Sequence, residues 1–183
     1  DYGGYKGTFG GNSGNRPAFA TGQFGGAVEF SSNEWIFTDA YADTMEVGEG
    51  NPRTISIWFK PYLQSHWGSG PNHHTWDPGL YWMGTTDGRF GTARDGWGIR
   101  GWSGGSVAGN NNYDRFISQH NYWDPHIVVS GGGLMDSWVH VAHIYTGTDL
   151  QVYVNGIKRY EAAQAMYTSG KSVWNGSYLR FGM

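Results

Sequence analysis

Tryptophan, tyrosine and histidine gather in the middle of the chain, in residues 62–126, within segments rich in glycine and asparagine. Flat aromatic rings can stack on the apolar faces of sugars, while Asn, Asp and His bond to hydroxyl groups. Trp and Tyr are equally enriched where proteins meet. The candidates for glycan or interface contact are Trp67, Trp76, Trp102, Tyr113, Tyr122 and Trp123. Their residue types leave a sugar and a protein partner open.

Histidine and aspartate suggest metal binding only weakly. Five of the seven histidines lie between residues 66 and 126, but no helical His pair or Cys partner typical of zinc accompanies them. Calcium takes oxygen ligands from loops, and Asp87, Asp95 and Asp114 are the candidates. Asp87 and Asp95 are each followed by a glycine, and Asp-Gly also forms turns without any metal. Calcium therefore stays an open cofactor, and no other is indicated.

Acidic residues give little support for catalysis. Glycosidases use two carboxylates close together, which on a strand requires acidic residues two positions apart. Glu46 and Glu49 sit three residues apart in a Gly/Asn-flanked segment, and solvated loop charges explain them better. A Ser-His-Asp type of nucleophilic triad is no better supported, although Ser and His are plentiful. The sequence predicts a protein that is not an enzyme.

Composition narrows the class of protein. The 183 residues fit one domain. The net charge of −3 argues against nucleic-acid binding. Aromatic residues reach 17% and glycines number 31, while charged residues make up only 15%. There is no cysteine, and no apolar run approaches the length of a membrane span, so we expect no membrane insertion.

Residues 138–160 define the elements that must position these side chains. Val139, Val141 and His143 alternate with His140, Ala142 and Ile144, which is the period of a strand with one buried face. A second alternating run follows at residues 150–154. Asn155-Gly156 then supplies the tight turn of a hairpin. His140 and His143 fall on opposite faces, so at most one can face the core.

Further strands are predicted at residues 53–61, 80–84, 96–102 and near the C-terminus, with two short strands in 25–37 around residues 31–33. In residues 53–61, Ile55, Ile57 and Phe59 form one face and Trp58 lies on the other with polar neighbours. No helical period exceeds two turns, and residues 160–167 allow one turn at most. The pattern predicts an all-β, two-sheet antiparallel jelly-roll sandwich.

Six short motifs carry a family resemblance over residues 22–183. They are FGGAVEF at 24–30, TISIWFKP at 54–61, GWGI at 96–99, WVHVA at 138–142, LQVYVNG at 150–156 and LRFG at 179–182. In this order they resemble the LamG-like jelly rolls of the concanavalin A-like lectin/glucanase superfamily. The resemblance implies two packed sheets, secretion and usually a binding or adhesive role. It names no ligand, because such folds host many functions.

The two ends of the chain depart from this family's pattern. The resemblance implies terminal strands that are missing here or supplied by a neighbour. We expect residues 1–22 to form a Gly/aromatic-rich arm and residues 23–183 to form the jelly roll. An excerpt of a longer protein explains the ends equally well. If a neighbour completes the sheet, strand addition builds a fibre, and the donor candidates are Tyr2, Tyr5 and Phe9.

The sequence therefore favours a secreted, non-enzymatic subunit that assembles with copies of itself into an extracellular fibre or surface layer. The alternative is a carbohydrate-binding module of a larger secreted protein, with a polysaccharide or glycoprotein as ligand. Either would lie outside the cell or on its surface, in a bacterial setting.

Overall fold

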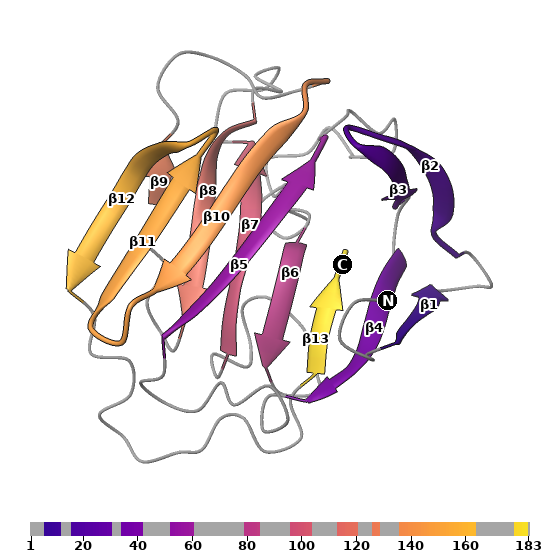
Figure 1. Cartoon of the computed structure of the whole chain (residues 1–183), viewed down its shortest axis with the longest axis horizontal. Helices are drawn as coiled ribbons and strands as arrows, with labels where there is room; N and C mark the ends of the chain where they lie inside the picture. The colour runs from indigo at the N-terminus through magenta and orange to yellow at the C-terminus, as the bar shows by residue number, and fades with distance from the viewer. Residues whose placement is uncertain are drawn as a thin grey trace, which may run out of the picture.

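The computed structural model describes residues 6–11, 16–30, 34–41, 52–60, 79–84, 96–103, 113–120, 126–128, 136–163 and 178–182. These residues form thirteen strands in three antiparallel sheets. The seven-stranded sheet has the order β1-β4-β13-β6-β7-β8-β9. Its strands are β1 Gly7–Gly11, β4 Glu34–Tyr41, β13 Tyr178–Phe181, β6 Gly79–Gly84, β7 Gly96–Ser103, β8 Tyr113–His120 and β9 His126–Val128. Figure 1 shows the four-stranded sheet packed across one face of this larger sheet. The predicted all-β sandwich is confirmed.

The four-stranded sheet has the order β12-β11-β10-β5. It comprises β12 Ile157–Ala163, β11 Asp149–Val154, β10 Val139–Tyr145 and β5 Arg53–Phe59. Asn155 and Gly156 join β11 to β12 with φ values of 50° and 78°, which is the left-handed backbone that a two-residue hairpin turn requires. The predicted hairpin is therefore confirmed. A register shift between Val152 and Tyr153 marks a bulge in this pair of strands.

The core lies between these two sheets. Every second residue of β10 and β11 is buried there, which is what the alternating sequence predicts. From the larger sheet, Tyr81 of β6 bonds to His143 of β10, and the buried Ile99 of β7 is the strand partner of Tyr81. The buried apolar residues are Leu80, Tyr81, Ile99, Val139, Val141, Tyr145, Leu150, Val152 and Val154. Full burial of such a side chain stabilises the fold by about 1.5–3 kcal/mol.

The Gly-rich N-terminal segment forms two strands where its composition gave no confident prediction. β1 pairs antiparallel with β4 at the edge of the large sheet. β2 (Ala18–Gly22) pairs with β3 (Gly25–Glu29), so this hairpin spans the predicted boundary at residue 22. Glycine is needed at position 10 because a Cβ there would meet the indole ring of Trp35. The division into arm and jelly roll stays a prediction.

Two other segments differ from expectation. Tyr113 and Asp114, predicted in a loop, begin β8, which the alternation of the sequence did not reveal. The segment after residue 160, where the sequence allows one helical turn, continues β12 as far as Ala163. Pairing with β11 decides this, because a short segment of weak propensity follows the neighbour that satisfies its backbone. No helix in the described part of the chain has the length and apolar character needed to cross a membrane.

Candidate functional site

The outer face of the four-stranded sheet carries an exposed aromatic side chain beside polar ones. β5 alternates between exposed and half-buried residues, so Ser56 and Trp58 point away from the core while Ile55 and Ile57 point toward it. His140 of β10 lies directly across from Trp58 in the strand register. Trp58 keeps 41% of its surface exposed. A large indole on this face is available for contact with a ligand.

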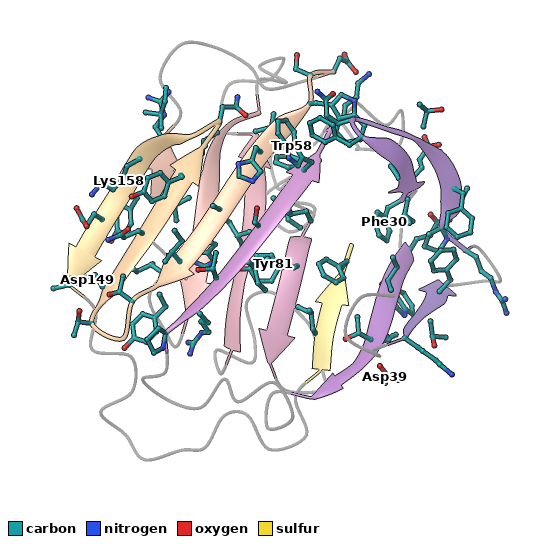
Figure 2. The ribbon with its side chains drawn as sticks, in the orientation of Figure 1. Phe30, Asp39, Trp58, Tyr81, Asp149 and Lys158 are labelled. Atoms are coloured by element: carbon teal, nitrogen blue, oxygen red, sulfur yellow. The ribbon has the colours of Figure 1, made fainter. Side chains whose placement is uncertain are left out.

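Three rings form a continuous array at this position. The ring centroids of Trp58 and His140 are 5.1 Å apart, with the planes tilted by 39°. Phe24, from the turn between β2 and β3, meets Trp58 edge-on at 5.4 Å and 83°. Phe24 itself is 76% exposed. Figure 2 shows Trp58 on β5 at the end that approaches the β2–β3 hairpin. We call Phe24, Trp58 and His140 the aromatic array.

Hydrogen bonds hold the imidazole of the array. Ser56 Oγ and His140 Nε2 lie 2.7 Å apart in a hydrogen bond. The His140 backbone N–H donates to Asn155 Oδ1 at 2.9 Å, and the Asn155 backbone N–H donates to the His140 carbonyl at 2.8 Å. The Ser56 bond thus orients the imidazole, while the two bonds to Asn155 fix the His140 backbone against the β11–β12 turn. The array needs little reorganisation before it contacts a partner, which lowers the entropic cost of binding.

A polar network continues across the same face on β11 and β12. Tyr153 donates its hydroxyl to Gln151 Oε1 at 3.3 Å, and Gln151 Nε2 donates to Glu161 Oε1 at 2.7 Å. Lys158 Nζ donates to Glu161 Oε2, also at 2.7 Å. This hydrogen bond raises the pKa of Lys158. The network presents oriented donors and acceptors with its two charges paired.

The inner face of the same sheet carries a different polar pair. His143 of β10 is fully buried, and its Nδ1 forms a hydrogen bond with the hydroxyl of Tyr81 from β6. Burial raises the pKa of Tyr81 well above its usual value, and the nearby charge of Arg53 offsets part of that rise. Arg53 in turn lies 4.9 Å above the Tyr145 ring. The Tyr81–His143 bond joins the two sheets within the core. The expectation that at most one of the two β10 histidines faces the core is confirmed.

Most residues predicted as a site from sequence fall outside the described part of the chain. These are Trp67, Trp76, Tyr122, Trp123, Tyr2, Tyr5, Asp87 and Asp95. Trp102 lies in β7 and Tyr113 and Asp114 in β8, where the structure describes only the backbone. Phe9 lies in β1, with its ring centroid 5.4 Å from that of Phe19. Their proposed roles stay predictions.

Sequence reasoning placed Trp58 on the polar face of its strand without selecting it as a site. A large aromatic ring among Thr54, Ser56 and Lys60 was the available signal, because outward positions of a strand are usually polar. Phe24 carried no such signal. Its role depends on the β2–β3 turn reaching the end of β5, which is a contact between segments distant in sequence.

The chemistry of this face is stacking and hydrogen bonding. Among the described residues, no group of three or more His, Cys, Asp or Glu side chains could hold a metal ion. Exposed rings beside oriented hydroxyl, imidazole and amide groups suit a ligand that has both apolar faces and many hydroxyls.

Comparison with known proteins gives a likeness in fold. No family model matches the chain, and no curated protein matches it by sequence. A solved structure is similar in fold: domain 4 of AbnA, a GH43 extracellular arabinanase from Geobacillus stearothermophilus, in complex with arabinotriose. The likeness covers 97% of this chain and 72% of that chain, with 18% identity and a TM-score of 0.55. At this identity the likeness establishes the β-sandwich fold.

Proposed function

We propose that this chain is a non-catalytic carbohydrate-binding module of lectin-like type that acts outside the cell. The observation that carries the proposal is the aromatic array of Phe24, Trp58 and His140 on the outer face of the four-stranded sheet. Such rings offer an apolar surface that is already exposed and held in place. Ser56 and the Tyr153–Gln151–Glu161 network supply hydroxyl-binding groups around it.

The fold likeness supports the same class of function. The similar structure is a domain of an extracellular arabinanase and was solved with arabinotriose. Folds of this kind host several functions, so the proposal depends on the side chains of this chain. The assignment to the LamG-like branch and a bacterial origin belong to the proposal as well. The loop aromatics Trp67, Trp76, Trp102, Tyr113, Tyr122 and Trp123 are proposed as a further contact surface.

Substitution of Trp58 tests the proposal. The wild-type chain is assayed for retardation in native gels that contain soluble polysaccharides, including linear arabinan. Trp58→Ala should weaken binding at least about fivefold, because a central aromatic contact typically contributes more than about 1 kcal/mol. Phe19→Ala is the matched control, since Phe19 is 82% exposed and belongs to a different ring pair. Equal binding by Trp58→Ala and the wild type would refute this site.

Self-assembly is a second candidate, in which β1 would be exchanged between copies. Strand β1 pairs with β4 at the edge of the large sheet within one chain. A fibre would require the same pairing between copies, with Tyr2, Tyr5 and Phe9 as donor residues. Light scattering over a concentration series tests this candidate. Concentration-dependent growth that disappears when residues 1–8 are deleted would support it, and a monomer at all concentrations would exclude it.

A further inference from the structure

The outer face of the four-stranded sheet contains a second aromatic side chain in line with the array. Tyr153 of β11 pairs with Ala142 of β10, and Ala142 pairs with Ser56 of β5, next to Trp58 along the strand. Trp58 and Tyr153 are therefore separated by two strand spacings across the sheet and by two residues along the strand direction. Strand geometry puts their Cα atoms on the order of 12 Å apart. A single sugar ring is too short to contact both side chains.

Ala142 leaves the sheet surface between the two aromatic residues free of a large side chain. The outward residues of β10 are His140, Ala142 and Ile144, and alanine is the smallest of the three. A ligand lying between Trp58 and Tyr153 crosses β10 between His140 and Ala142, and Ala142 is the residue of the two whose side chain rises less above the backbone. The ligand passes beside Ser56. One outward position beyond Tyr153 it reaches Gln151, whose amide is already oriented by Tyr153 and Glu161.

Four charged residues on or beside this face, namely Lys60, Asp149, Lys158 and Glu161, balance one another. Lys158 and Glu161 neutralise each other through a bond of 2.7 Å. The Asp149 carboxylate accepts a hydrogen bond from the Thr148 hydroxyl at 2.7 Å, and Lys60 lies exposed at the end of β5. The four charged groups sum to zero at neutral pH. No excess positive charge is present among them to attract an acidic polysaccharide, so the face is matched to an uncharged one.

We infer that the ligand is an uncharged, linear polysaccharide whose chain crosses the strands of this sheet, from Trp58 over Ala142 to Tyr153. The inference rests on the proposed carbohydrate-binding function and adds the ligand class and its direction. One sugar residue stacks on Trp58 and another contacts Tyr153. Hydroxyl groups near the Trp58 end bond to Ser56, and those just beyond Tyr153 bond to Gln151. Binding therefore strengthens with chain length until both aromatic contacts are made.

Two alanines on the four-stranded sheet allow a matched test. Ala142→Leu raises the path between the aromatic residues, whereas Ala163→Leu places the same side chain on β12, beyond that path. Calorimetry with neutral oligosaccharides of one to six residues, derived from arabinan, xylan and mixed-linkage glucan, measures affinity and length dependence. Polygalacturonate and alginate serve as charged probes. Circular dichroism verifies that each variant is folded.

The expected result is binding of a neutral oligosaccharide that strengthens with length and weakens about tenfold in Ala142→Leu and in Tyr153→Ala, with Ala163→Leu unchanged. If Trp58→Ala loses binding while Ala142→Leu and Tyr153→Ala bind as the wild type does, the crossing path is wrong and the proposed function stands. Equal or tighter binding of the charged probes would overturn the ligand class. If the wild type binds no polysaccharide in the panel, both the inference and the proposed function fail.

Discussion

The two histidines of β10 show how one strand serves two different environments. His143 is fully buried and bonds to Tyr81 across the core, while His140, three residues earlier, stacks on Trp58 at the surface and bonds to Ser56. The residue type and the strand are the same, and only the face differs. The inner histidine joins the sheets, whereas the outer one helps to build a contact surface. The inner face therefore holds the two sheets together, and the outer face is the surface that we propose for binding.

The largest expected effect comes from a charge placed on the inner face. Val152 is fully buried in β11, and Val152→Asp would bury a carboxyl group that lacks a partner. We expect a loss of more than about 4 kcal/mol in the free energy of unfolding, which is comparable with the whole stability of a domain. Thr54→Asp, on the outer face of β5, should cost at most about 1 kcal/mol. Urea denaturation measures both, and similar losses would contradict the division of faces.

Removing each histidine separately compares the two faces directly. His143→Ala takes away packed volume and the partner of the Tyr81 hydroxyl, so we expect a loss of about 2–4 kcal/mol in unfolding free energy. His140→Ala should cost less than about 1 kcal/mol but weaken glycan binding. Thermal and urea unfolding of both variants, with calorimetric titration, separates the outcomes. A larger stability loss in His140→Ala would reverse the assignment.

The stability of the protein at alkaline pH tests the buried environment of Tyr81 on the inner face. Burial raises the pKa of Tyr81 in the folded protein, while in the unfolded chain tyrosine titrates near its usual value of about 10. The stability that the neutral Tyr81 hydroxyl contributes is therefore fully present below about pH 10. It is lost as the pH rises from there toward the pKa of Tyr81 in the folded protein. The loss approaches about 1.4 kcal/mol per pH unit.

Tyr81→Phe isolates this contribution. At pH 8 the variant should be less stable by about 1–3 kcal/mol because the bond between His143 and the Tyr81 hydroxyl is lost. Above about pH 10 the difference from the wild type should shrink, since only the wild type carries the titrating hydroxyl. Urea denaturation at pH 8, 9, 10 and 11 measures the difference. A gap that stays constant over this range would show that Tyr81 titrates normally.

The smallest effect is expected where the outer face carries its ion pair. Lys158 is exposed, and its bond to Glu161 competes with water and salt. Lys158→Ala should leave the urea midpoint unchanged within error. A clear drop in the midpoint at low salt would mean that the outer network stabilises the fold as well as presenting polar groups.

The strands with regular alternation were predictable from sequence. β5, β10 and β11, together with the Asn155-Gly156 turn, follow from periodicity and turn chemistry alone. β1, β2 and β8 were not, because glycine or polar residues obscure their period and a neighbouring strand completes their hydrogen bonds. The candidate site was found only in part. The sequence pattern placed Trp58 on a polar face, but its partners Phe24 and His140 come from distant segments.

By itself the sequence determined the β-class, the inward residues of the best strands and the absence of cysteine chemistry, because period and composition are local properties. Tertiary structure decided which histidine meets Tyr81, which ring meets Trp58 and which small residue lies between Trp58 and Tyr153. These outcomes depend on strand register and sheet order. Hydrogen bonding between segments far apart in the chain sets both, and local pattern does not encode them.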